Sequence, residues 1–395
     1  MKYNILIKYI NSIPSATKEN GIDISRLLLL CEKLGRVNVG AGYIYTSGGA
    51  YAHASGTVLE SVMKASGYTV ARITDAYGFD IKRSIYVDGI SPSIEEFTNI
   101  LTYIRDILKK NKTVTFLREE VVFAICLYVS KILGAKYVIL ENTREDTKGM
   151  FEICAPFNFA IVPKLYGTVS QDELDRVASC INLVNRGVVT GNNQHYNYLS
   201  DKCHKAGIRL LIHRTTRVVE EKMRQQTFVY NEKQYTLKSA SPLLRDATVS
   251  VFELAELMKD HRIKISSAAI SGGIGSVGNC GCFEVLSLSP MIISDISSSC
   301  GQLELAYEKL CEYSQRSNLS GVVAICESDV YADMLKDVFA KEKSLRIIDA
   351  SSVSYRELAK SILTPENREK LTFILGGLEF TEGLGGALKT AMDRI

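Results

Sequence analysis

Apolar positions in the first part of the chain switch between helical and strand spacing. Residues 22–34 repeat at helical spacing behind Asp23, a residue type favoured at helix N-caps. The short apolar run 43–46 predicts a strand, and 68–74 predicts a second strand after Gly67. Between these strands lies a helix whose apolar face consists of Val58, Leu59, Val62 and Met63. The pattern therefore predicts a strand–helix–strand unit that is preceded by a helix.

The same alternation continues through the middle of the chain. The sequence SPSIEE predicts the start of a helix over 91–110, because serine, a proline in the first turn and following acids favour helix N-termini. Helix, strand, strand, helix and strand then follow in order over 119–133, 135–141, 157–164, 171–184 and 186–191. A hairpin is expected over 227–237 and a helix over 250–258. Short connections between such elements favour a parallel sheet wrapped by helices.

A glycine-rich segment divides the chain. The stretch 267–281, SAAISGGIGSVGNCG, holds five glycines in 15 residues and predicts a boundary. We expect a large α/β domain over 1–266, a glycine-rich interdomain linker over 267–282, and a smaller α/β domain over 283–395.

Composition narrows the class of protein. Lys and Arg number 47 against 44 Asp and Glu, so the net charge of +3 favours neither a nucleic-acid nor a membrane partner. The start, 1–10, is too short and too polar for a signal segment, and nowhere do about 18 apolar residues run together. We expect a cytoplasmic protein whose 10 scattered cysteines are reduced.

The turn TSGGAYAHASGT, 46–57, raises the first question of chemistry. A phosphate loop needs converging backbone amides, a lysine for the phosphates and a hydroxyl for Mg²⁺. Glycines and hydroxyls are supplied by Gly48, Gly49, Ser55 and Thr57, but the nearest lysine is Lys64, too far along the helix. An ordinary strand-to-helix turn and a nucleotide loop both fit.

The order of these segments resembles the folylpolyglutamate and dihydrofolate synthases of the Mur ligase superfamily. The resemblance runs from YINSIPSATKENGIDISRLLLLCEKLGRV through VLESVMKASGYTV and IYVDGISPSIEEF to CFEVLSLSPMIISD and ILGGLEFTEGLGGAL, and covers essentially the whole chain. It implies a large P-loop-like parallel-sheet domain and a smaller Rossmann-like domain that close on ATP, folate and glutamate. It also implies an amide ligation in which an acyl phosphate is made with ATP and Mg²⁺ and an amine then displaces phosphate.

Several family residues are replaced here. Against the family turn G-T-N-G-K-G-S-T, Ala52 stands at the lysine and Ser55 at the threonine, a metal-binding position. The resemblance gives Glu141 as a second metal ligand and keeps Asp295 from the D-G-A-H-N-P signature. Cys282 stands at the interdomain arginine.

Further family positions have also changed. By the resemblance, the Gly-Gly-Arg segment of the family falls on Glu145, Asp146 and Thr147. The L-D-H motif falls near Lys164 and Tyr166, and the carbamylated lysine falls at about Ile181. Losing one electrostatic contact of this kind costs roughly 10² to 10³ in rate, so the combined losses predict a protein that no longer ligates.

Each candidate residue also has a plainer interpretation. Glu141 fits a solvated carboxylate at a strand end, and Asp295 fits a helix cap. His53 is either an anion contact that replaces the lysine or a loop histidine facing solvent. Cys280, Cys282 and Cys300 form a weak zinc motif. The segment with His195 and His204 is either a ligand loop or a polar connection into the next strand.

Three functions remain open at this point. The first is a ligase-like protein without ligase activity that binds a small molecule or serves as a partner subunit of an active ligase or biosynthetic complex. The second is an active ligase with a site rebuilt from other cations: Lys82, Arg83, Lys164 and Arg186. The third is a nucleotide-independent enzyme that uses the interdomain cleft.

Overall fold

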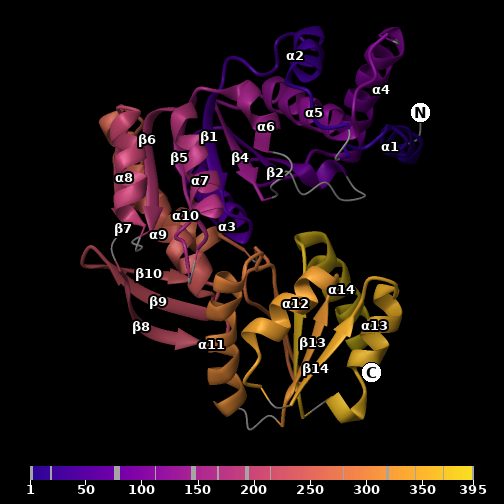
Figure 1. The fold of residues 1–395 in the computed structure, drawn as a ribbon, viewed down its shortest axis with the longest axis vertical. Coiled ribbons are helices and arrows are strands. Elements are labelled where there is room, and N and C mark those ends of the chain that lie inside the picture. The colour runs from indigo at the N-terminus through magenta and orange to yellow at the C-terminus, as the bar shows by residue number, and fades with distance from the viewer. Residues whose placement is uncertain are drawn as a thin grey trace.

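The computed structural model describes most of the chain (Figure 1). The described residues are 3–17, 20–74, 81–111, 113–143, 148–166, 169–191, 195–213, 215–278, 280–316, 320–342, 344–367 and 369–393. No helix in these ranges is long and apolar enough to cross a membrane.

A seven-stranded sheet forms the centre of the large domain, in the order β3-β2-β4-β1-β5-β6-β7. Its strands are β1 (Gly42–Ser47), β2 (Val70–Thr74), β3 (Ile85–Val87), β4 (Tyr137–Asn142), β5 (Phe157–Ile161), β6 (Val184–Gly191) and β7 (Arg209–His213). Strand β3 runs antiparallel to β2, and the other neighbours run parallel. The parallel sheet predicted from the alternating pattern is confirmed.

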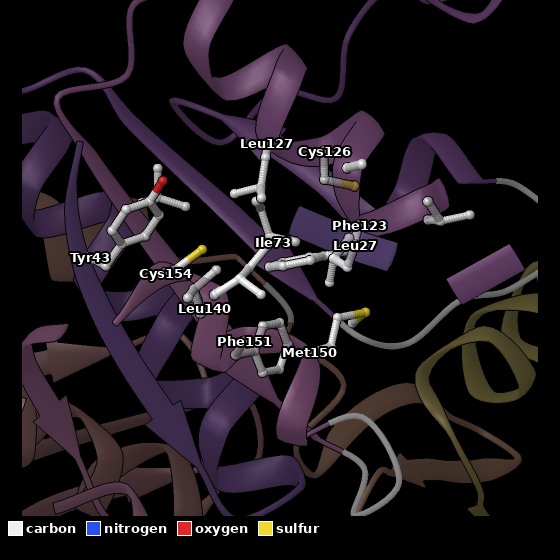
Figure 2. Packing of buried hydrophobic residues seen from close by; sticks show 14 of the residues in the cluster. Leu27, Tyr43, Ile73, Phe123, Cys126, Leu127, Leu140, Met150, Phe151 and Cys154 are labelled. Carbon is white, nitrogen blue, oxygen red and sulfur yellow. The ribbon is translucent and has the colours of Figure 1, made fainter. Parts of the chain in front are cut away.

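Helices cover both faces of this sheet. One face packs against α1 (Tyr3–Asn11), α2 (Ile24–Lys33), α4 (Ile94–Lys110), α5 (Arg118–Ile132), α6 (Lys148–Phe151), α7 (Gln171–Ala178) and α8 (Tyr196–Lys205). The other face packs against α3 (Ala50–Ala65), α9 (Pro242–Asp260) and α10 (Ser267–Ser276). Figure 2 shows part of the first layer, where Ile73 and Leu140 from the sheet meet Phe123 and Phe151. Burial on both faces explains why the strands read as continuous apolar runs.

Two helix starts match the capping chemistry of the sequence. The Asp23 side chain accepts from the amides of Ser25 and Arg26 at the start of α2. Ser93 and Glu96 form a capping box at the start of α4. Both helices therefore begin where local sequence predicts.

The predicted long turn over 46–57 is wrong. Only Gly48 and Gly49, both with positive φ, form the turn, and α3 begins at Ala50. Ala52, His53, Ser55 and Thr57 consequently lie on the first two turns of a helix. The stretch contains alanines that favour helix, and the two glycines suffice for the sharp change of direction.

The segment expected as a linker over 267–282 is helical in its first part. Helix α10 packs on α3, and a Cβ at Gly273 would lie 2.6 Å from the Cα of Val62. The glycine is used for close helix packing and not for flexibility, so α10 belongs to the large domain.

A three-stranded antiparallel sheet, β10-β9-β8, lies beside α9. Its strands are β8 (Arg217–Lys222), β9 (Gln225–Tyr230) and β10 (Lys233–Leu237). The β9–β10 hairpin confirms the prediction, and its tip residues Asn231 and Glu232 have positive φ as a tight hairpin turn requires.

The small domain has a five-stranded sheet in the order β11-β12-β15-β13-β14. The strands are β11 (Glu284–Leu288), β12 (Met291–Asp295), β13 (Val322–Cys326), β14 (Leu345–Asp349) and β15 (Leu371–Leu375). Helices α11 (Cys300–Arg316) and α12 (Asp329–Val338) cover one face, while α13 (Tyr355–Ile362) and α14 (Leu378–Met392) cover the other.

Candidate functional site at the interdomain cleft

The central strands of the large sheet end together at the side that faces the small domain. Thr46 of β1 and Thr74 of β2 are both in register with Glu141 of β4. In open α/β sheets ligands bind outside the carboxyl ends of the strands, so this edge is the natural place for a site.

Glu141 is fully buried and ion-paired on both oxygens. Its Oε1 accepts from the Arg72 guanidinium at 3.0 Å, and its Oε2 lies 3.0 Å from Nδ1 of His53. Burial raises the pKa of a carboxyl group, but the charges of Arg72 and His53 together lower the pKa of Glu141 below its usual value. The carboxylate is therefore held ionised inside the protein.

Arg72 connects this pair to a second acid. Its Nε donates to Glu60 at 2.7 Å, and the other oxygen of Glu60 accepts from the backbone amide of Gly89 at 2.7 Å. The guanidinium also lies 4.5 Å from the centre of the Tyr86 ring. With a buried cation between two buried carboxylates, the whole network is satisfied internally.

Gly56 permits this arrangement. A Cβ at this position of α3 would lie 2.2 Å from Oε1 of Glu141. Because any larger residue would displace the carboxylate, this glycine makes room for the ion pair between Glu141 and Arg72.

Side chains from the small domain cover the N-terminus of α3. The Ser298 hydroxyl accepts from the amide of Ala50 at 3.3 Å, and Gln302 donates to the carbonyl of Gly48 at 2.8 Å. A Cβ at Gly49 would lie 1.7 Å from Oγ of Ser298. The helix end that would face a phosphate is thus capped by protein.

The hydroxyls predicted for this region face elsewhere. Ser55 donates to the carbonyl of Tyr51 at 2.7 Å, one turn back along α3. The Thr57 Oγ1 is buried and forms no hydrogen bond.

A cleft of about 280 Å³ remains between the two domains. Gly49, Ala50 and His53 line it from the large domain, as do Thr74, Arg83, Tyr86 and Thr143. The opposite wall carries the carboxylates of Glu327, Glu379 and Glu382. Arg83 forms an ion pair with Glu382 at 2.6 Å across the cleft, so the described lining has excess negative charge.

Asp295 lies at the end of β12 in the small domain and is also buried. It accepts from the backbone amides of Phe283 and Ser297, each at 2.7 Å. Burial raises the pKa of Asp295, and these hydrogen bonds only partly offset the rise. Cys282 is buried beside it and neither residue is among those lining the cleft.

No family model and no curated protein matches the chain in sequence. Solved folylpolyglutamate synthases match over their whole length: the Lactobacillus casei enzyme (TM-score 0.74, 17% identity, covering 99% of this chain and 100% of that one), a complex with AMPPCP and folate (0.76, 17%, 99% and 100%) and the Mycobacterium tuberculosis enzyme with ADP (0.72, 11%, 100% and 99%).

The chain has the fold of the folylpolyglutamate synthases. The two-domain α/β architecture implied by the resemblance is confirmed. The β1–α3 connection, the carboxylate at the end of β4 and the small domain are linked by contacts that the sequence did not predict.

Two of the cations proposed for a rebuilt site, Lys164 and Arg186, contact residues that do not line the cleft. Lys164 pairs with Asp246 at 3.0 Å, and Arg186 lies 5.9 Å from the centre of the Phe159 ring. Ala52 is fully buried. In the described part of the chain Arg83 is thus the member of the proposed rebuilt set that lines the cleft.

The metal alternatives receive no support within the described residues, where no three His, Cys, Asp or Glu side chains converge. Cys300 is exposed, whereas Cys280 and Cys282 are buried. His195 and His204 belong to the start and end of α8. The replaced positions 145–147 lie outside the described residues.

Sequence reasoning missed Arg72, Ser298 and Gln302. Arg72 offered a signal, because it interrupts the apolar strand YTVARIT and a charge in a buried strand requires a partner. The two small-domain residues offered none, since nothing in the run DISSSCGQ marks them as caps of a distant helix.

Proposed function

We propose that this protein has the folylpolyglutamate synthase fold but has lost ATP-dependent amide ligation, and that it acts as a binding protein or partner subunit. The observation that carries the proposal is the ion pair between Arg72 and Glu141. The resemblance gives Glu141 as a metal ligand, and here the Arg72 guanidinium binds this carboxylate in place of a metal ion.

The electrostatics of the large domain support loss of the metal. Mg²⁺ prefers near-octahedral oxygen ligands, and one or two carboxylates usually anchor it. One oxygen of Glu141 accepts from the Arg72 guanidinium and the other lies 3.0 Å from Nδ1 of His53, while the Ser55 hydroxyl donates to a backbone carbonyl. A divalent ion brought to this position would meet the positive charge of Arg72 at close range.

The α3 N-terminus supports loss of the phosphate contacts. A phosphate at a helix N-terminus needs unoccupied amides and benefits from a nearby cation. Ser298 takes the Ala50 amide, Ala52 stands at the lysine position, and three glutamates form the facing wall. Two of the similar solved structures are complexes with AMPPCP and with ADP, so ATP with Mg²⁺ is the ligand to test, and we expect weak or no binding here.

An active ligase with a rebuilt site is the competing proposal, and Arg83 is the observation in its favour. This arginine lines the cleft and is about half exposed. Its pairing with Glu382 would have to break before it could meet an anion. One such residue does not replace the several anion contacts that ligation requires.

Titration of the full chain with Mg-ATP tests the proposal. We expect no saturable heat and no phosphate release above the blank when ATP is combined with a panel of carboxylates and amino acids. Circular dichroism on the same sample verifies that the protein is folded. Micromolar affinity for Mg-ATP together with ATP turnover would contradict the proposal and favour an active ligase with a rebuilt site.

The partner role needs its own measurement. Sedimentation of the chain mixed with an active folylpolyglutamate synthase from the same cell should give a complex, with a change in the activity of the enzyme. If the two sediment independently and the activity is unchanged, this partner is excluded. A thermal-shift screen of small metabolites then tests the binding role.

A further inference from the structure

A second groove, of about 760 Å³, lies between the three-stranded antiparallel sheet of the large domain and the small domain. Its walls come from the β8–β9 turn, the residues that follow β10, strand β11 and helix α14. In the described lining, Glu382 is the one residue that this groove shares with the interdomain cleft. The volume is in the range of small-molecule sites, roughly 300–1,000 Å³.

The buried part of the lining offers a hydrogen-bond donor. Ser239 is only 9% exposed, and its Oγ accepts from the amide of Ser241 at 3.1 Å. A serine hydroxyl also has a proton to donate, and no contact among the described residues uses the proton of Ser239. The groove therefore has a preformed polar donor in its interior.

Three cations surround this donor, each from a different segment. Lys238 follows β10 and Lys389 lies in the last turn of α14; both are exposed, and neither forms a hydrogen bond or ion pair with a described residue. Arg224, in the β8–β9 turn, donates from Nε to the carbonyl of Val285 at 3.2 Å and from Nη2 to that of Leu286 at 3.3 Å. These bonds hold the guanidinium on the edge of β11 and use two of its five N–H donors.

The charge of this lining is opposite to that of the cleft. Of its two carboxylates, Glu382 pairs with Arg83 at 2.6 Å, and Arg83 does not line the groove. Glu284 is then the one acid set against three cations in the described lining. The groove consequently has an excess of positive charge and of free donors, which is the complement of an anion.

We propose that this groove binds a small non-aromatic polyanion, a molecule with two or more carboxylate or phosphate groups. Lys238, Lys389 and Arg224 meet its charged groups, and the Ser239 hydroxyl donates to one of them. Phe283 is the aromatic residue of the described lining and is only 2% exposed, so no open ring is available to stack a base, and a nucleotide is not the ligand favoured here. The proposal is independent of the loss of ligation, because the groove contains no residue of α3 or β4.

Isothermal titration of the full chain with citrate, and separately with fructose 1,6-bisphosphate, tests the proposal in a metal-free buffer of low ionic strength. We expect saturable binding of at least one probe, weakened by added sodium chloride because salt screens exposed charges. Binding of citrate alone assigns a carboxylate ligand, and binding of the bisphosphate alone assigns a phosphate ligand; binding of both shows recognition of the shared charge. If neither probe binds saturably, the proposal is wrong.

A pair of double variants locates the binding. Lys238→Gln with Lys389→Gln should weaken it about ten-fold or more, since hydrogen bonds to charged groups are among the stronger ones. The fold should be unaffected, because both lysines are exposed and without described partners, whereas Arg224 is left unchanged because it also bonds to β11. Lys109→Gln with Lys110→Gln is the matched control, which removes the same charge from exposed positions at the end of α4. Equal weakening in both double variants would overturn the proposal, since it would show attraction to net charge and no specific groove.

Discussion

Two buried carboxylates occupy equivalent places in the two domains of this protein. Glu141 lies at the end of β4 in the large sheet, and Asp295 lies at the end of β12 in the small sheet. Glu141 is neutralised by Arg72 and His53, whereas the described partners of Asp295 are backbone amides. The topology delivers an acid to each switch point, but its neighbours decide what that acid does.

The difference appears in the direction of the pKa shifts. Nearby positive charge lowers the pKa of Glu141, and burial raises the pKa of Asp295. The first carboxylate is thus held charged, while the second is easier to protonate. Variants of the residues around the two acids test this contrast.

Arg72→Met should have the largest effect, because it leaves Glu60 and Glu141 buried without their cation. Removing one partner of a buried ion pair costs about 3–5 kcal/mol of unfolding free energy, measured by urea denaturation. Adding Glu141→Gln to this variant should recover part of the loss, since one uncompensated charge disappears. A loss below about 1 kcal/mol, as is usual for surface pairs, would show that the network is not a buried one.

Gly56→Ala should destabilise by about 1–3 kcal/mol, the usual cost of overpacking a well-packed interior. The new methyl group would overlap Oε1 of Glu141. Gly386→Ala in α14 is the matched control, because no atom lies within 4 Å of the Cβ position there. The control should be neutral or stabilising, as expected when alanine replaces glycine within a helix. Equal effects at both positions would contradict the close approach of Glu141 to α3.

The two acids should give pH dependences of opposite sign. Because the pKa of Glu141 is lower in the folded state, its contribution is present above the unfolded value near about 4.3 and is lost as the pH falls through the folded pKa. The pKa of Asp295 is raised, so its contribution is present below about 3.9 and is lost as the pH rises through the folded pKa.

Urea midpoints measured across the acid range separate these contributions. Glu141→Gln should reduce the loss of stability on acidification. Asp295→Asn should remove the loss that accompanies rising pH, although it also removes one of the two backbone hydrogen bonds, because the new amide nitrogen cannot accept. If both variants change the pH dependence in the same direction, the contrast between the two acids is wrong.

Ser298→Ala should have the smallest effect on stability, about 1 kcal/mol, as for other helix caps. Ser354→Ala removes a cap of similar strength within the small domain, where Ser354 accepts from Glu357 at the start of α13. Only Ser298→Ala should increase hydrogen exchange at the start of α3, because only that cap joins the two domains. Unchanged exchange at Ala50 would count against the interdomain contact.

Local sequence determined much of the framework of this protein. Apolar spacing identified the alternating elements, the Asp23 and Ser93 caps marked two helix starts, and the Asn231-Glu232 tip marked a hairpin. These features depend on residues within a few positions of one another, so they can be read without knowing the fold. The start of α3 was misplaced because its glycines and hydroxyls suit a phosphate loop as well as a short turn.

Tertiary structure alone decided what the site became. His53 and Arg72 meet Glu141 across 88 and 69 positions of sequence, and Ser298 reaches Ala50 across 248. Such pairs follow from strand order and from the closure of one domain on the other, and periodicity carries no information about either. The resemblance of the sequence predicted that Ala52 stands where the family has a cation. The fold supplied the physical counterpart, a buried arginine that satisfies the acid from the neighbouring strand.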